Sequence, residues 1–231
     1  KIKIAQTNWI GKSEGAEITF QVDGSDDTIT VFSTRPDTIF GATFLVLAPE
    51  HPLARTLLTD ETRELVENYI NDAVKKSEIE RSNDTKEKTG VFSGSYAINP
   101  ATGQKIPIWI ADYVLGGYGT GAVMGVPAHD DRDFAFAEKF ELPVVEVIER
   151  PEDDIDTDAC YRGEGVLLNS GAFDGTRSED AREQIVAWLE QEGKGKSQIT
   201  YKMRDWLISR QRYWGAPIPI VHVDGLEPIA V

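Results

Sequence analysis

Cysteine is nearly absent from this chain of 231 residues, in which Cys160 is the single copy. One cysteine cannot form an internal disulfide, and it cannot supply the thiolates of a Cys-based zinc site. No apolar run approaches the length of a membrane span, and nothing resembles a signal peptide. These absences exclude a disulfide-stabilised scaffold and a membrane-spanning protein. We therefore expect a soluble protein of the reducing cytoplasm.

Positive charge is also scarce, because 24 Lys and Arg residues face 39 Asp and Glu residues and the formal net charge is −15. Such an acidic chain is not expected to hold long stretches of nucleic acid by charge alone. The charge is uneven, however. The segment from Lys194 to Arg212 has six basic residues and one acid, so it carries +5 and the rest of the chain carries −20. This segment suits local contact with a polyanion or a solvated surface, and composition alone favours the surface.

Short strands dominate the pattern of the first 150 residues. Residues 17–22 and 28–32 alternate polar and apolar side chains around an Asp23-Gly24 turn, which predicts a hairpin. Residues 43–48 form a continuous apolar run that is typical of a strand buried on both faces. Further strands are predicted over residues 91–98, 106–110, 121–126 and 144–148.

Three helices are predicted among these strands. Residues 59–81 have apolar residues at helical spacing, with Thr59 or Asp60 as the cap. Acidic residues precede a second helix over Phe134–Phe140, and a third covers 177–192, between a Thr176/Glu179 capping box and Gly193. Many short strands with helices outside them predict class α+β, with a mixed β-barrel core or a curled sheet surrounded by helices.

Neither end of the chain resembles a natural terminus, so we expect a segment of a longer protein. Domains inserted into a host have neighbouring ends. We therefore expect residues 1–15 and 200–215 to run close together.

The first segment with chemical potential is Ser33-Thr34-Arg35-Pro36-Asp37-Thr38, which follows a predicted strand. Pro36 fixes its own φ and biases Arg35 toward extended geometry, so the turn is stiff. Its hydroxyls can bind a polar ligand or position a water. They can equally bond to their own backbone, and physical chemistry alone favours that simpler interpretation.

Two other segments leave their interpretation open. The glycine-rich stretch Leu115–Gly121 lacks the spacing and the Lys of a Walker loop, and it fits either close backbone approach to a ligand or a strand bend. His129-Asp130-Asp131-Arg132-Asp133 has metal-ligating side chains. Adjacent residues point in different directions at a helix start, however, so a metal site is the less favoured interpretation, and a carboxylate here can also bind an ammonium group. No nucleophile elbow is present, and Cys160 has no evident His partner, which disfavours a covalent nucleophile.

These segments resemble motifs of one family. Thr34–Thr38, continued by Phe40–Thr43 and Leu47–Pro52, resembles the threonine-rich region of leucyl-tRNA synthetase editing domains of the bacterial type. Gly119–Asp130, followed by Arg132-Asp133, resembles the second motif of that family. Isoleucyl and valyl relatives share this plan, but Asp37–Gly41 favours the leucyl enzyme.

The resemblance implies a division of the chain. Residues 1–14 are expected to form the entry linker from a class I synthetase catalytic domain, because Asn8–Gly15 resembles the family's entry strand. Residues 15–200 are expected to form the editing domain. Residues 201–231 are expected to form return strands toward the catalytic domain, since Asp205–Gly215 resembles that junction.

The resemblance also implies roles for individual residues. Thr34, Ser33 and Asp133 are expected at the catalytic centre, where Asp133 holds the α-ammonium of the substrate and the hydroxyls bind substrate and position water. Thr38 is expected to exclude the branched end of leucine, and Arg35 to engage the terminal adenosine. The residues expected to line or support the pocket are Tyr118, Met124, Val126 and Asp130.

The implied activity is hydrolysis of the ester in tRNA-Leu that carries norvaline, isoleucine or a similar amino acid, with leucine excluded. The aminoacylation site of a synthetase needs a second, hydrolytic site because one methylene group changes the binding free energy by only ~1–3 kcal/mol, a magnitude taken from sister synthetases. The expected partners are the 3′ terminal adenosine of aminoacylated tRNA-Leu and the remainder of the synthetase, for a monomer without cofactor, metal or membrane contact. The alternatives are a non-catalytic tRNA-binding insertion, an isoleucyl- or valyl-type editing domain, and a metal-dependent hydrolase centred on His129 and Asp130.

Overall fold

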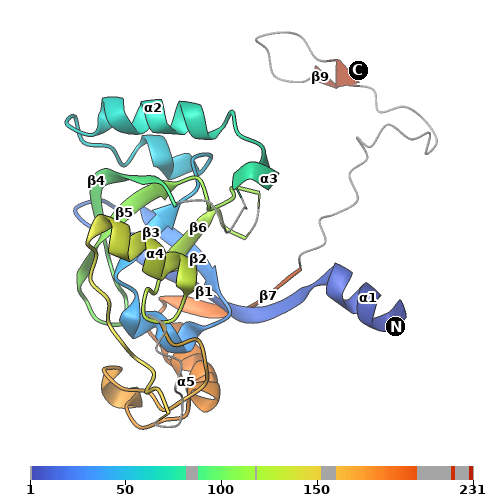
Figure 1. Cartoon of the computed structure of the whole chain (residues 1–231), viewed down its shortest axis with the longest axis vertical. Coiled ribbons are helices and arrows are strands. Elements are labelled where there is room, and N and C mark those ends of the chain that lie inside the picture. Colours follow the sequence, from blue (N-terminus) through green and yellow to red (C-terminus); the bar gives the residue numbers. More distant parts are fainter. Residues whose placement is uncertain are drawn as a thin grey trace.

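The computed structural model describes residues 2–81, 88–117, 119–151 and 160–201, and the backbone of 220–221 and 229–230 (Figure 1). The helices are α1 (Ile2–Ile10), α2 (Arg63–Ala73), α3 (Glu78–Arg81), α4 (Asp131–Phe140) and α5 (Ser178–Gln191), with 3-10 helices η1 (Pro36–Gly41), η2 (Pro52–Arg55) and η3 (Gly171–Phe173). The strands are β1 (Lys12–Val22), β2 (Thr28–Ser33), β3 (Phe44–Leu47), β4 (Gly90–Ile98), β5 (Lys105–Ala111), β6 (Ala122–Gly125), β7 (Gly195–Tyr201), β8 (Ile220–Val221) and β9 (Ile229–Ala230).

Seven of these strands form one curled sheet in the order β2-β1-β4-β5-β3-β6, with β7 also paired to β1. The β3–β5 pair is parallel, and the other pairs are antiparallel. This confirms a mixed fold of strands and helices, but the predicted closed barrel is wrong. Cα atoms of the edge strands β2 and β6 approach within 8 Å, yet the two strands share no ladder in the described part of the chain.

Most of the predicted strands are confirmed. The β1–β2 hairpin is antiparallel, with Gly24 at φ +74° in its turn. The prediction over 144–148 is wrong, since Ile148 makes only an isolated bridge with Leu167. The backbone N–H groups of Val147 and Ile148 donate instead to the imidazole of His129.

The helix predictions hold in kind but not in their bounds. The helix predicted over residues 59–81 is two helices, α2 and α3, and Thr62 rather than Thr59 or Asp60 is at the cap position of α2. The helix predicted over Phe134–Phe140 ends as predicted but begins earlier, because Asp130 caps it and the acidic residues Asp131 and Asp133 belong to its first turn. The capping box of α5 is wrong, because Arg177 holds the cap position without a side-chain hydrogen bond.

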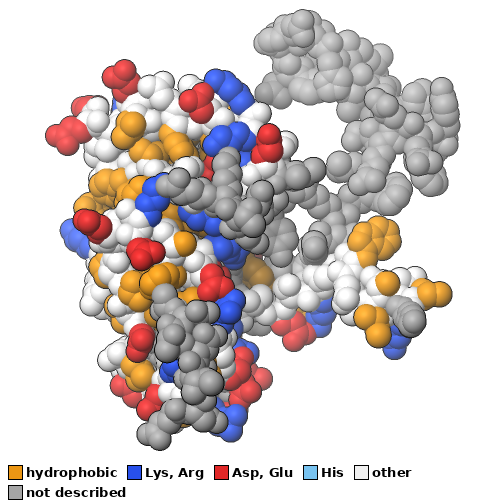
Figure 2. All heavy atoms as spheres, viewed as in Figure 1, with side chains coloured by type: hydrophobic (Ala, Val, Ile, Leu, Met, Phe, Trp, Pro, Cys, Tyr) orange, Lys and Arg blue, Asp and Glu red, His pale blue; other side chains and the backbone are white. Residues whose placement is uncertain are grey.

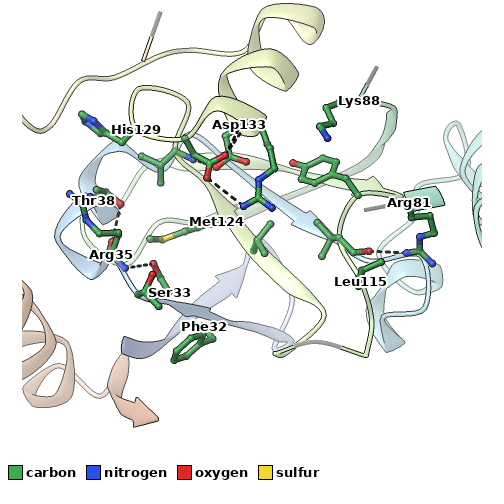
Figure 3. A pocket seen from close by; sticks show the side chains of 17 residues that line it. Phe32, Ser33, Arg35, Thr38, Arg81, Lys88, Leu115, Met124, His129 and Asp133 are labelled. Carbon is green, nitrogen blue, oxygen red and sulfur yellow. Dashed lines mark hydrogen bonds and ion pairs between the residues drawn. The ribbon is translucent and has the colours of Figure 1, made fainter. Parts of the chain in front are cut away.

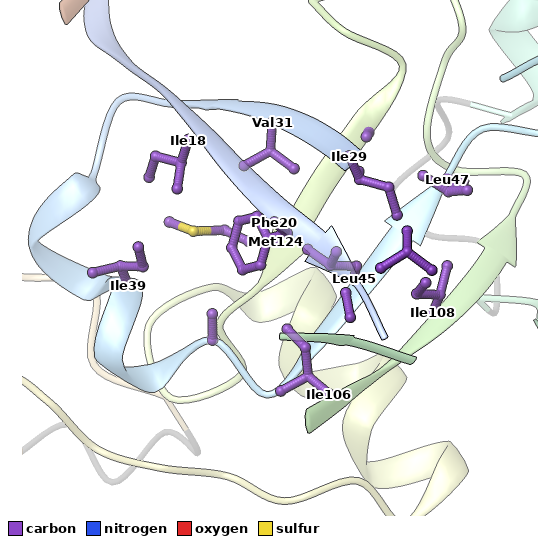
Figure 4. Close-up of a cluster of buried hydrophobic side chains, with 14 of the residues drawn as sticks. Ile18, Phe20, Ile29, Val31, Ile39, Leu45, Leu47, Ile106, Ile108 and Met124 are labelled. Carbon is purple, nitrogen blue, oxygen red and sulfur yellow. The ribbon is translucent and has the colours of Figure 1, made fainter. Parts of the chain in front are cut away.

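Two hydrophobic clusters lie on opposite faces of β3. Leu45 and Leu47 face the main core, which the sheet wraps around (Figure 4). Phe44 and Val46 face the second cluster, where α4 covers the sheet with Phe136. Burial on both faces explains the unbroken apolar run in this strand.

The ends of the described domain lie together, as expected, because Lys12 pairs with Tyr201 and Ser13 with Thr200. Residues 202–215 lie outside the described part. The entry segment is not a strand up to residue 10, since α1 occupies it. Side chains of α1 such as Ile2 and Trp9 are 77% and 64% exposed, and Figure 2 shows these apolar side chains gathered at this end of the molecule. None of the described helices is long and apolar enough to span a membrane.

Candidate functional site

A cavity of about 460 Å³ opens beside the two unpaired sheet edges. Its walls come from the end of β2 and the start of η1, from β6, from the segment after β5, and from the start of α4 (Figure 3). Segments far apart in the sequence therefore share one cavity, which is the arrangement that the two sequence motifs require.

The segment 33–38 forms one wall as a stiff turn. The Ser33 Oγ accepts a hydrogen bond from the Arg35 N–H at 3.0 Å. The Thr38 Oγ1 donates to the Arg35 carbonyl at 2.9 Å, and Pro36 begins the 3-10 helix between them. Two of the three hydroxyls thus bond to the local backbone, as the simpler interpretation proposed. They still border the cavity, together with Thr34.

Another wall is the start of α4, where two carboxylates have different surroundings. The Asp130 side chain caps the helix by accepting from the N–H groups of Arg132 and Asp133, at 2.9 and 3.2 Å. The Asp133 side chain is only 8% exposed and accepts from the Val126 N–H at 2.9 Å. Asp130 therefore organises the backbone that carries Asp133.

Asp133 has an altered pKa. Burial and, to a smaller extent, the negative charge of Asp130 raise the pKa of its carboxyl from 3.8 to about 7, against the opposing effects of the Val126 hydrogen bond and the positive charge of Arg132. Among the described residues Arg132 acts on this carboxyl only as a nearby charge, and its guanidinium pairs with Asp130 instead, at 3.5 Å. A buried carboxylate without a cation is costly, so this wall favours a cationic ligand group.

Eight of the nine site residues predicted from the sequence line this cavity: Ser33, Thr34, Arg35, Thr38, Met124, Val126, Asp130 and Asp133. Figure 3 shows Met124 between Asp133 and Ser33. The ninth, Tyr118, lies outside the described residues.

The guanidinium of Arg35 is bonded within the protein. Its Nε lies 3.1 Å from both carboxylate oxygens of Asp37, and its Nη2 lies 2.8 Å from one of them. Asp37 is fully buried and receives a second cation, the Nε of Arg182, at 3.2 Å. Sequence reasoning missed this cluster, because Arg182 is 145 positions away and nothing in its surroundings marks a partner.

His129 borders the cavity but uses both ring nitrogens on the backbone. Its Nδ1 donates to the Tyr161 carbonyl at 2.6 Å, and its Nε2 accepts from the N–H groups of Val147 and Ile148 at 3.0 and 3.2 Å. Burial lowers the pKa of the imidazole, which favours this neutral form. Neither nitrogen is left for a metal ion, and no group of three metal ligands occurs among the described residues.

Three of the cavity residues that were not predicted are Arg81, Lys88 and Tyr113. Arg81 is buried and donates to the carbonyls of Asp112 and Val114 at 2.7 and 2.8 Å, so it fastens the segment after β5. The Nζ of Lys88 lies 6.0 Å from the centre of the Tyr113 ring. The Tyr113 hydroxyl is buried without a hydrogen-bond partner among the described residues. Nothing in the local sequence distinguishes these residues from ordinary surface or core positions.

The glycine-rich stretch combines turn and close-approach roles. Gly119 and Gly121 have φ of +60° and +70°, which other residues rarely adopt. A side chain at Gly116 would lie 2.9 Å from the Glu50 Cβ. The stretch thus needs glycine for its own backbone path beside the cavity.

Comparison with known proteins gives two family matches. The chain matches the model described as "Leucyl-tRNA synthetase, editing domain" over residues 7–190, and "tRNA synthetases class I (I, L, M and V)" over residues 178–231. It is also similar to a chain in the crystal structure of the ternary complex of Agrobacterium radiobacter K84 agnB2 LeuRS-tRNA-LeuAMS. The identity is 39% and the TM-score 0.72, over 99% of this chain and 25% of that chain. The present chain therefore spans about a quarter of that structure's chain.

Proposed function

Because the chain belongs to the family of leucyl-tRNA synthetase editing domains, we propose that it hydrolyses the ester of tRNA-Leu that carries norvaline, isoleucine or a similar amino acid. Leucine would remain attached. The observation that supports this proposal is the single cavity shared by the hydroxyl-bearing segment 33–38 and the buried Asp133. A non-catalytic tRNA-binding insertion would not need a cavity with this pairing.

The first element of the proposed mechanism is an ammonium anchor at Asp133. One of its carboxylate oxygens accepts from Val126, which leaves the other for a ligand. An α-ammonium would supply the positive charge that this buried carboxylate lacks, and ionised hydrogen bonds of this kind are strong. The anchor would fix the ester carbonyl of the substrate relative to the opposite wall.

The second element is steric selection at Thr38. This side chain is 2% exposed, and its hydroxyl is held by the Arg35 carbonyl. We propose that its fixed methyl group leaves room for an unbranched side chain but not for one that forks at the γ-carbon. Exclusion by a rigid wall can exceed the ~1–3 kcal/mol that separates such amino acids by attraction alone.

The third element is the attacking water. Thr34 and Ser33 would hold it beside the ester carbon. Its oxygen adds there, the bond to the ribose oxygen of the tRNA breaks, and a proton of the water passes to that ribose oxygen. No cavity residue is an evident general base, so rate would come mainly from positioning. The neighbouring ribose hydroxyl of the substrate would assist, and undiminished hydrolysis of a tRNA without that hydroxyl would contradict this step.

The remaining cavity residues would bind the end of the tRNA. Met124 and Val126 give apolar walls. Arg35 is proposed to contact the terminal adenosine while its guanidinium stays bonded to Asp37. The rest of a synthetase would supply most of the affinity, since the chain is acidic and tRNA binding depends on basic contacts.

The test is release of norvaline from mischarged tRNA-Leu. Asp133→Ala should abolish release, and Thr38→Ala should allow hydrolysis of leucyl-tRNA. Wild-type turnover in Asp133→Ala would contradict the proposed role of Asp133 as the ammonium anchor. Leucyl-tRNA that stays intact with Thr38→Ala would contradict the proposed steric role of Thr38. Tight tRNA binding by the wild type without any release would favour the non-catalytic insertion.

A further inference from the structure

We propose that Arg182 of α5, which does not line the cavity, is a positioning residue for leucine exclusion. It would act through Asp37 on the neighbouring Thr38. This inference rests on the proposed function, and it assigns the accuracy of the steric wall to a helix outside the site.

Asp37 is the centre of the argument because it is a carboxylate with no exposed surface. Such a charge is costly unless it is paired and hydrogen-bonded. Its two cations come from different elements. Arg35 precedes it in the same turn, with contacts of 2.8 and 3.1 Å, and Arg182 reaches it from α5 at 3.2 Å. The carboxylate thus ties η1 to α5.

Arg182 is itself held by a second acid. Its Nη2 donates to Glu164 Oε1 at 2.5 Å, and the other oxygen of Glu164 accepts from the Ser178 hydroxyl at the start of α5. The guanidinium therefore bridges two carboxylates in a fixed planar geometry, which a compact ammonium with rotatable donors does not impose. This bridge fixes the direction of the Arg182 side chain.

An apolar contact supports the same junction. Phe40 of η1 stacks on Trp188 of α5 with ring centres 6.2 Å apart, and Phe173 lies 5.9 Å from Phe40. The aromatic rings hold the end of η1, and the ion pairs hold its beginning. Loss of Arg182 would therefore loosen the beginning of η1 without detaching it from the domain.

Thr38 follows Asp37 directly, and both its N–H and its hydroxyl bond to the Arg35 carbonyl. A movement of Asp37 therefore carries the Thr38 methyl with it. A displacement on the order of 1 Å changes rates by ~10²-fold in well-positioned sites. The wall that rejects a single extra branch is more sensitive to such a movement than the anchor at Asp133, which belongs to α4.

The experiment compares kcat/KM for norvalyl-tRNA-Leu and leucyl-tRNA-Leu in the full-length protein. Arg182→Met removes the charge and keeps an unbranched apolar side chain. Arg177→Met is the matched control, because Arg177 is the cap residue of the same helix, is exposed, and pairs through its side chain only with Glu179 in the described part of the chain. We expect the norvalyl-to-leucyl ratio to fall about tenfold in Arg182→Met, through faster leucyl hydrolysis, and to stay unchanged in Arg177→Met.

A purely stabilising role for Arg182 would slow both esters in the same proportion, and that result would overturn the proposal. Should Arg182→Met fail to fold, Arg182→Lys keeps the charge but does not hold both acids in the same fixed geometry. The proposal then requires a norvalyl-to-leucyl ratio of kcat/KM that is lower than the wild-type ratio but still greater than one. An unchanged ratio in a folded Arg182→Lys would also overturn it.

Hydrogen exchange separates this inference from the proposed function, since it needs no substrate. The Thr38 N–H bonds to Arg35 and the Ala42 N–H bonds to Ile39, so both report on η1. We expect faster exchange of the Thr38 amide in Arg182→Met and not in Arg177→Met. Unaltered exchange refutes the positioning role, whereas a wild type that hydrolyses neither ester refutes the proposed function alone.

Discussion

Replacing Asp133 with Asn is expected to stabilise the free protein while it destroys the proposed activity. The carboxyl of Asp133 is buried beside Asp130 without an ion pair among the described residues, and its pKa is raised to about 7 despite the opposing charge of Arg132. Asn keeps the shape and an oxygen that accepts from the Val126 N–H, but it carries no charge. The substitution therefore removes the cost of ionisation and also removes the ammonium anchor.

The expected gain depends on pH in a defined direction. The folded protein binds the Asp133 proton more tightly than the unfolded chain, whose carboxyl has a pKa of 3.8. Wild-type stability attributable to this group is fully present below pH 3.8 and is lost as the pH rises toward about 7. A shift of this size corresponds to about 4 kcal/mol at pH 8 and to about 2 kcal/mol at pH 5, each relative to Asn.

Urea unfolding of both proteins at pH 5 and pH 8, at one ionic strength, measures this difference. We expect the free energy of unfolding of Asp133→Asn to exceed that of the wild type by more at pH 8 than at pH 5. A less stable variant at pH 8, or a difference that does not grow with pH, would refute an uncompensated buried carboxylate. Release of norvaline should fall below detection at both pH values.

Further predictions concern single contacts of the site. Thr38→Ser keeps the hydrogen bond to the Arg35 carbonyl but loses the methyl group, so it should allow hydrolysis of leucyl-tRNA. Thr38→Val keeps the methyl group and should still exclude leucine. The reverse order in an ester-hydrolysis assay would assign exclusion to the hydroxyl. Tyr113→Phe removes a buried hydroxyl without a described partner and should not lower the free energy of unfolding in urea. The matched Tyr69→Phe loses bonds with Thr89 and Asp112 and should cost ~1–2 kcal/mol, so equal losses in the two variants would contradict the assignment. A chelator should leave hydrolysis unchanged, since both nitrogens of His129 are bonded to the backbone; loss of activity restored by added metal would contradict this.

The elements that the sequence predicts well are those whose signal is local. Alternation along β1 and β2 and the glycine of their turn need no distant partner, and the apolar run of β3 reflects burial on both faces. The wrong predictions depend on distant contacts. Thr176 did not cap α5 because its carbonyl accepts from Leu167, which ties that residue into the preceding turn. Residues 147–148 look like a strand, but His129 takes their N–H groups.

The site residues also separate into those that a local signal predicts and those that depend on distant contacts. Physical chemistry alone left segment 33–38 between a ligand-binding loop and a self-bonded turn, and the structure shows features of both. The family resemblance supplied residues that do border one cavity. It supplied no reason to select Arg182 or Tyr113, because burial and pairing across 145 positions are properties of the folded chain.

The open sheet, which departs from the predicted barrel, also explains where the cavity lies. Neighbouring strands in a ladder lie about 4.8 Å apart, with their backbones bonded to each other. Had β2 and β6 closed the barrel, that ladder would fill the space between them. Instead Phe32 and Ser33 of β2, and Val123 and Met124 of β6, turn an unpaired gap into the walls of a cavity of about 460 Å³. The sheet is therefore open between β2 and β6, where the proposed function needs room for an aminoacyl group.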